Sequence, residues 1–150
     1  MVAWRTCKTR HDPWDGTGAA LEGGRWNSPG RPVLYAADTF AGTLVEILAH
    51  SARPRTLPGA HHSIRLDLPD ELLEELQPGS LSGWHLPYSM AARAFGDQWL
   101  VEARTPVLVV PSVPARPVGR SVLINPMHAE APRIARSAPF VVRWDDRLFV

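Results

Sequence analysis

Apolar residues form short runs that divide the first half of the chain into a strand and a helix. Residues 33–37, Val-Leu-Tyr-Ala-Ala, predict a short buried strand. Residues 40–50 predict a helix that Asp38 or Thr39 can cap. Large apolar side chains share one face of this helix, at Phe40, Leu44, Ile47 and Leu48. Glu46 is the only acidic residue inside the helix.

Two further elements follow. Between residues 64 and 68, apolar side chains alternate with Arg65 and Asp67, which predicts a strand with one buried face. Residues 69–77 predict a short helix with its leucines turned inward, because Pro69-Asp70 is a helix start and Pro78-Gly79 a stop. Residues 78–88 are expected to form a loop.

The last third of the chain favours strands. Ser89 can cap a helix that ends near Ala103. Two apolar runs, 107–110 and 122–124, are short and β-branched, which favours strands buried on both faces. Residues 140–144 are expected to form the last strand. Helices lie between the early strands and strands dominate late, so we expect a single α+β domain, residues 1–150, with a mixed sheet of mostly short strands.

Residues 10–32 contain few helix or strand signals and many turn residues, such as Asp15-Gly16-Thr17-Gly18. We expect a long loop here. Loops of this length inside compact domains are usually functional.

Composition narrows the classes of function. With 150 residues, 45% hydrophobic and 21% charged, the chain is typical of one globular domain. Sixteen basic residues nearly cancel fifteen acidic ones, which argues against a nucleic-acid binder that works by bulk electrostatics. Lys8 is the only lysine. Arginine suits bidentate recognition of phosphate, although the base composition of a genome would give the same excess.

The sequence indicates a cytoplasmic protein. Cys7 is the only cysteine, so no disulfide within the chain is possible and a cysteine-based zinc or catalytic site has little support. The N-terminal residues lack the apolar run of a signal peptide. No stretch of about 18 uncharged apolar residues occurs, so we expect no membrane span.

The segment 23–30, Gly-Gly-Arg-Trp-Asn-Ser-Pro-Gly, is the most unusual in the chain. Paired glycines allow close approach of backbone to a ligand, and the guanidinium of Arg25 can form a fork onto phosphate oxygens. The alternative is a structural turn in which Arg25 pairs with a carboxylate and Trp26 fills the core.

Four other positions have both a functional and a structural interpretation. Tyr35 is a ligand platform or a core aromatic, and Glu46 is a functional acid at a cleft or a plain surface glutamate. Ser112 follows an apolar strand but lacks the Gly-x-Ser-x-Gly elbow of a serine hydrolase. Asn125 lies in a turn where it can bond its own backbone. The pair His61-His62 lacks metal-ligand spacing, so no metal site is expected.

Together these segments resemble the RES-domain family. The Gly-Gly-Arg-Trp-Asn element with its downstream tyrosine and glutamate carries the resemblance, which spans nearly the whole chain. The matching segments are residues 15–19, 23–30, 34–37, 44–48, 96–100, 110–112 and 123–128. One departure is Gly119-Arg120-Ser121, where the family pattern has an acidic residue and an asparagine.

The resemblance implies a fold similar to ADP-ribosyltransferases and a toxin of a bacterial toxin–antitoxin pair that depletes NAD+. It implies NAD+ as substrate without a further cofactor, and a partner antitoxin with a helix-turn-helix DNA-binding part, whose other end blocks the cleft. The implied catalytic residues are Arg25, Tyr35, Glu46 and Ser112, with Ser121 and Ser89 as alternatives for the serine. Arg5, Asn27 and Asn125 are the implied substrate-binding residues.

Three functions fit these residues. The first is cleavage of the nicotinamide–ribose bond of NAD+ by hydrolysis or phosphorolysis. The second is transfer of ADP-ribose to a cellular protein. The third is a non-catalytic module that binds a partner and merely retains the fold.

Overall fold

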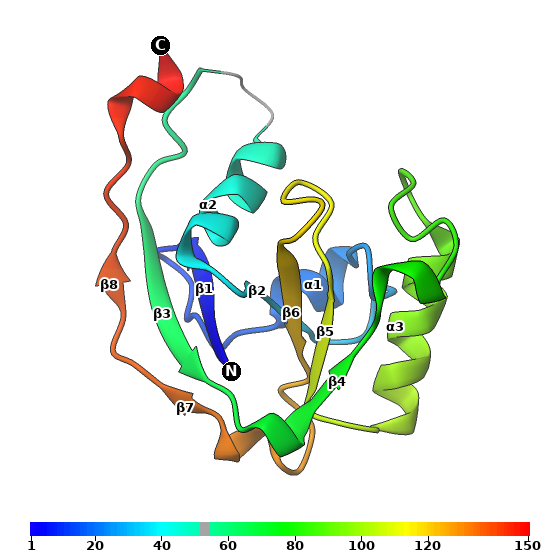
Figure 1. The fold of residues 1–150 in the computed structure, drawn as a ribbon. Coiled ribbons are helices and arrows are strands. Elements are labelled where there is room, and N and C mark those ends of the chain that lie inside the picture. The colour runs from blue at the N-terminus through cyan, green and yellow to red at the C-terminus, as the bar shows by residue number, and fades with distance from the viewer. Residues whose placement is uncertain (52–54) are drawn as a thin grey trace.

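The computed structural model describes residues 1–51 and 55–150. In this part of the chain, one mixed sheet curls through the molecule in the order β4-β5-β6-β2-β1-β3-β7, with β8 also paired to β3 (Figure 1). The strand pairs are antiparallel except the parallel pair β4–β5. The strands are β1 Val2–Lys8, β2 Leu34–Ala37, β3 His61–Asp67, β4 Leu73–Glu75, β5 Val107–Pro111, β6 Arg120–Ile124, β7 Ala135–Arg136 and β8 Phe140–Val141. The single-domain α+β prediction with a mixed sheet is confirmed.

Three α-helices accompany the sheet in the described residues: α1 Thr17–Glu22, α2 Phe40–Ala49 and α3 Met90–Glu102. The Thr39 hydroxyl accepts a hydrogen bond from the Gly42 amide, and the Ser89 hydroxyl accepts one from the Ala92 amide. Both caps satisfy an amide of the first helical turn. The predicted starts of α2 and α3 are confirmed, with Thr39 rather than Asp38 as the cap of α2.

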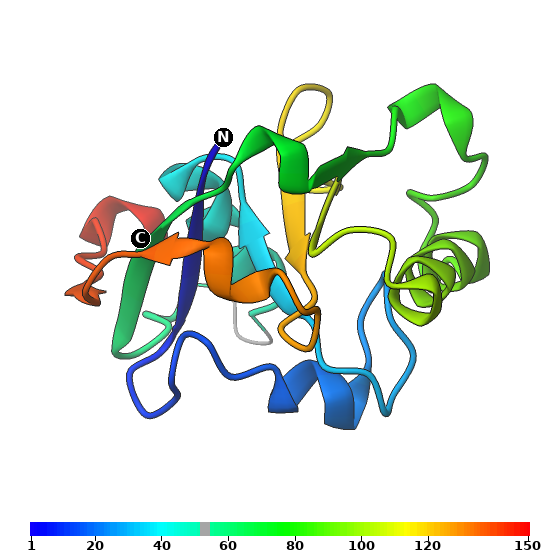
Figure 2. The same ribbon diagram turned by 90° about the horizontal axis from the view of Figure 1, so that it is seen from below.

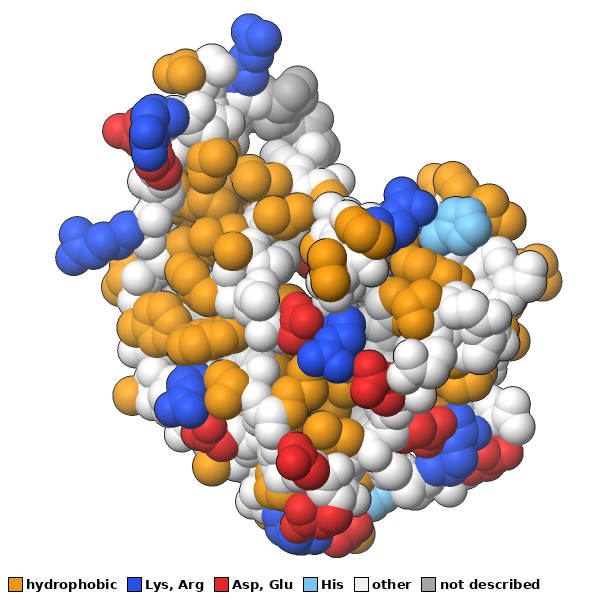
Figure 3. Space-filling model, in the orientation of Figure 1, with side chains coloured by type: hydrophobic (Ala, Val, Ile, Leu, Met, Phe, Trp, Pro, Cys, Tyr) orange, Lys and Arg blue, Asp and Glu red, His pale blue; other side chains and the backbone are white. Residues whose placement is uncertain are grey.

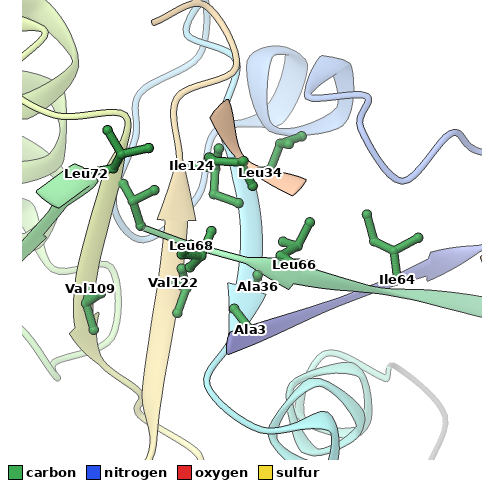
Figure 4. Close-up of a cluster of buried hydrophobic side chains, with 12 residues drawn as sticks. Ala3, Leu34, Ala36, Ile64, Leu66, Leu68, Leu72, Val109, Val122 and Ile124 are labelled. Atoms are coloured by element: carbon green, nitrogen blue, oxygen red, sulfur yellow. The ribbon is translucent and has the colours of Figure 1, made fainter. Parts of the chain in front are cut away.

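The core lies on both faces of β2, β5 and β6. One face packs Leu34, Val109 and Val122 into a cluster that continues onto β1 and β3 (Figure 4). The other face packs Val110 and Leu123 against Trp99 of α3. Side chains alternate between the two clusters along each strand, so β5 and β6 are buried on both faces as predicted.

Helix α2 rests on the sheet through small residues rather than through its predicted apolar face. Gly42 and Thr43 are the buried residues of α2, and the larger apolar side chains are half-buried or exposed. The Oγ1 atoms of Thr43 and Thr6 lie 2.8 Å apart, and Thr6 donates to the Ser63 hydroxyl at 3.0 Å. These hydroxyl contacts fix α2 on β1 and β3.

The structure corrects four predictions. Residues 73–75 form a strand after a 3-10 turn, because they pair with β5 in parallel register. The predicted loop 10–32 contains α1, and β1 was not predicted although it pairs along its whole length with β3. The last strand ends at Val141, and beyond it only the Val142 amide bonds to β3, at the carbonyl oxygen of its first residue, His61.

Residues 9–32 run from the end of β1 past α1 to α3, along one end of the molecule (Figure 2). This route brings Trp26 of the segment 23–30 into the cluster of Val110, Leu123 and Trp99. Within the described ranges, no helix is long and apolar enough to cross a membrane.

Candidate functional site

Glu46 is held by two serines. The Ser112 hydroxyl donates to Glu46 Oε1 at 3.0 Å, and the Ser121 hydroxyl lies 3.3 Å from the same oxygen. Ser112 is 3% exposed and Ser121 9%, whereas the side chain of Glu46 is 31% exposed. The second carboxylate oxygen, Oε2, lies 3.8 Å from the ring of the exposed His50. Glu46 is therefore a half-buried acid where β5 ends and β6 begins, rather than a plain surface glutamate.

The register of β5 and β6 brings the two serines together. Val110 pairs with Ser121, and the Ser112 amide donates to the Gly119 carbonyl, which closes the hairpin between the strands. Ser112 is two residues beyond Val110, so its side chain lies on the same face as that of Ser121. The surface is indented beside this hairpin, between the lobes that carry α2 and α3 (Figure 3).

Tyr35 of β2 lies on the same face of the sheet as the two serines, two residues before Ala37, the partner of Ser121. Ala37 pairs with Ser121, and Tyr35 pairs with Leu123. The Tyr35 hydroxyl donates to Asn27 Oδ1 at 2.6 Å and accepts from the Trp26 amide at 3.2 Å. Burial raises the pKa of Tyr35 to about 12, although the nearby Arg93 and Arg25 charges oppose this. Tyr35 is thus a core aromatic whose neutral hydroxyl holds the loop that carries Arg25.

Arg25 lies beyond Tyr35, against the loop before α3. Its Nη1 atom donates to the carbonyl oxygens of Trp84 at 2.9 Å and Leu86 at 2.7 Å. These partners are backbone groups rather than the carboxylate that the structural alternative supposed. Trp26 is 3% exposed and fills the core as that alternative expected.

The segment that carries Arg25 is fixed on α3 by three contacts. Gly96 lies directly under the Trp26 backbone, where an added Cβ would come within 2.7 Å of the carbonyl carbon. The Asp97 carboxylate accepts from the Ser28 amide at 2.8 Å and from the Ser28 hydroxyl. Arg93 donates to the Gly24 carbonyl oxygen. Residues 96–100 belong to the segments that carry the family resemblance, but no local pattern indicated that they hold this loop.

The three implied substrate-binding residues are engaged with backbone. Arg5 donates to the carbonyl oxygens of Pro13, Tyr35 and Asp15 where β1 and β2 separate, and it also lines a cavity of about 200 Å³. Asn27 is fully buried, and its amide donates to the carbonyl oxygens of three residues of the same loop region. Asn125 accepts from the Met127 amide.

Asn125 is also remote from the serines, because it follows the opposite end of β6 from Ser121. Ser89, an alternative for the functional serine, is the cap of α3 and donates to the Gly83 carbonyl oxygen. The structure therefore brings Glu46, Ser112 and Ser121 into contact, and Tyr35 on the same face bonds the backbone of Trp26, next to Arg25. In residues 1–51 and 55–150, no group of three or more potential ligands is placed to hold a metal ion.

The curled mixed sheet carries the serine-held glutamate and, beyond Tyr35, the arginine loop on one face. Comparisons with known proteins agree with this arrangement. The family model of the RES domain matches residues 2–145. The chain belongs to the RES domain family.

Curated relatives support this assignment. The chain is 38% identical over 138 residues to the "Prs ADP-ribosylating toxin" of Sphingobium sp. (strain YBL2). The matched region covers 89% of this chain and 83% of the relative. It is 32% identical over 132 residues to "Toxin Res" of Pseudomonas putida KT2440, and the matched region covers 87% of this chain and 88% of that relative.

The fold also resembles a solved structure, the M. tuberculosis MbcT–MbcA toxin–antitoxin complex. The TM-score is 0.77 at 19% identity, over 99% of this chain and 86% of the solved chain.

Proposed function

We propose that this chain is the toxin of a toxin–antitoxin pair and that it cleaves the nicotinamide–ribose bond of NAD+. The observation that carries the proposal is Glu46, a half-buried carboxylate whose one oxygen is held by Ser112 and Ser121. A fixed negative charge of this kind suits a reaction that develops positive charge on a sugar ring.

The residues match what the bond cleavage requires. Nicotinamide leaves with the electron pair of the C–N bond and becomes neutral, so no general acid has to protonate it. The ribose carbon becomes cationic, and the Glu46 carboxylate stabilises this charge and binds the ribose hydroxyls. Arg25 binds the pyrophosphate, because its Nε and Nη2 hydrogens remain after Nη1 is bound by the loop carbonyls. The proposal includes no cofactor besides NAD+ as substrate.

The acceptor decides the product. Water gives ADP-ribose and releases one proton, inorganic phosphate gives the ADP-ribose phosphate ester, and a protein side chain becomes ADP-ribosylated. Transfer to a protein is the second candidate function, and the 38% identity to the "Prs ADP-ribosylating toxin" favours it.

An antitoxin is the proposed macromolecular partner, with a helix-turn-helix DNA-binding part and an end that blocks the cleft. The similarity in fold to the toxin chain of a toxin–antitoxin complex supports such a partner. The proposal places the protein in the cytoplasm, where NAD+ is available.

The test is incubation of purified protein with NAD+, with and without inorganic phosphate, and measurement of released nicotinamide. We expect release by the wild type and its loss in Arg25→Ala. Absence of release under both conditions would refute the proposal. Label from adenine-labelled NAD+ that remains on a protein band would favour transfer. A non-catalytic module predicts instead that the substitution leaves growth inhibition on expression unchanged.

A further inference from the structure

Ser121 is one of the alternatives for the functional serine, and the structure places it at Glu46. Its hydroxyl lies 3.3 Å from Glu46 Oε1, the oxygen that Ser112 also contacts. A carboxylate oxygen only accepts hydrogen bonds, so both serines act as donors here.

We infer that Ser121 is a positioning residue for Glu46, and that it forms with Ser112 a two-hydroxyl clamp on Oε1 that leaves Oε2 for the ribose of the substrate. This inference rests on the proposed function. It also changes the task of Ser112, which then acts through Glu46 rather than on the substrate directly.

Each serine is itself fixed. The Ser112 hydroxyl accepts from the Ala115 amide at 3.3 Å, so its own donor points at Glu46. Ser121 follows Arg120, whose guanidinium pairs with Asp38 and Glu75 at 3.3 and 3.0 Å. These ion pairs tie the start of β6 to the end of β2 and to β4. The strand that presents Ser121 is therefore held in place against β2 and β4.

The surroundings of Glu46 make the serines the groups that orient it. The α2 helix supplies His50, which lies at Oε2 and is 84% exposed. From β5 and β6 the facing groups are the uncharged Ser112 and Ser121, and the Arg120 charge beside them is directed to its two carboxylate partners.

A clamp on one oxygen has a direct consequence for catalysis. A glutamate side chain has several rotamers in water, and ordering it as the transition state forms costs free energy. Two hydroxyls that hold Oε1 beforehand spare this cost in the transition state. Their removal is therefore expected to lower kcat, whereas loss of a direct substrate contact would raise KM.

The test compares Ser121→Ala, Ser121→Thr, Ser112→Ala and the double alanine variant in nicotinamide release. We expect Ser121→Ala to lower kcat about fivefold and Ser112→Ala about tenfold, with KM within about twofold of wild type. The double variant should lose about fiftyfold or more. Ser121→Thr keeps the hydroxyl and should restore most of kcat. Ser137→Ala, which removes a hydrogen-bonded serine at the far edge of the sheet, is the control.

A second measurement tests the contact without activity. In a double-mutant cycle of urea unfolding, Ser121→Ala and Glu46→Ala should shift the midpoint non-additively, because each removes the same hydrogen bond. Additive shifts, an unchanged kcat in Ser121→Ala, or a raised KM with unchanged kcat would each overturn the inference. Failure of wild-type protein to release nicotinamide would refute the proposed function instead, and the unfolding cycle would still test the clamp.

Discussion

The contact between Gly96 and the Trp26 backbone gives a quantitative test of how the Arg25 loop is positioned. Gly96 lies inside α3, and the Trp26 carbonyl occupies the space of a side chain there. The change Gly96→Ala introduces one methyl group, which would lie 2.7 Å from the carbonyl carbon and 3.1 Å from the Trp26 Cα and would overlap the carbonyl oxygen. Either the loop or the helix has to move.

Two opposing effects set the magnitude. Alanine is a better helix former than glycine by about 1 kcal/mol. Overpacking of a buried contact costs about 1–3 kcal/mol, and the upper end applies because the obstacle is a backbone held by Tyr35 and Asp97. We therefore expect a net loss of about 2 kcal/mol in the free energy of unfolding, or roughly 4–8 °C in Tm for a chain of this size.

Urea unfolding of Gly96→Ala and Gly18→Ala measures this difference. Gly18 is also in a helix, but a Cβ there would meet nothing within 4 Å, so its replacement should be neutral or stabilising by up to about 1 kcal/mol. Gly96→Ala should also lower kcat/KM for NAD+, because the displaced loop carries Arg25. A Gly96→Ala variant as stable as wild type would refute the account of how this loop is held.

Two further predictions concern the same loop. The pKa of Tyr35 is raised from its ordinary value of 10 to about 12 in the folded protein, so the folded state favours the neutral hydroxyl. This preference contributes up to about 2–3 kcal/mol to the free energy of unfolding. The contribution is complete below pH 10 and is lost as the pH rises from 10 to 12. Urea unfolding between pH 10 and 12 should show this loss in wild type but not in Tyr35→Phe. The control Tyr88→Phe should behave like wild type, because Tyr88 is 97% exposed. The same dependence of unfolding free energy on pH in all three proteins would contradict the burial of Tyr35. Asp97→Asn weakens both hydrogen bonds from Ser28, so it should lower the free energy of unfolding by about 1–2 kcal/mol and kcat/KM several-fold. The control Asp145→Asn, at an exposed ion pair, should change neither quantity. Equal effects of the two substitutions would show that Asp97 does not hold the loop.

Local patterns predicted the elements that carry their own signals. The apolar runs of β5 and β6 and the capped starts of α2 and α3 are strong signals, and the structure contains them. Residues 73–75 were predicted to be helical but form strand β4. They become a strand by pairing with β5, more than thirty residues away, and the local pattern of apolar residues contains no information about that pairing. Strand β1 was missed because its side chains are mostly half-buried and mix polar with apolar types.

The site shows the same division. Glu46 stood out as the one acidic residue in a helix, and Arg25 as part of an unusual glycine-rich segment. That Ser121 reaches Glu46 is a consequence of the β5–β6 register and of where α2 crosses the sheet, so no local pattern could select it over other serines. The backbone partners of Arg5 and Asn27 likewise exist only after the loop folds.

The central claim is that the Glu46 carboxylate stabilises the cationic ribose when NAD+ is cleaved. The most direct test is the rate of nicotinamide release by purified wild type and Glu46→Gln, with and without phosphate. Glutamine keeps the size of the side chain and an acceptor for Ser112 but removes the charge, so we expect release to fall by about a hundredfold or more while the fold, followed by circular dichroism, is retained. Release by Glu46→Gln at the wild-type rate would contradict the claim.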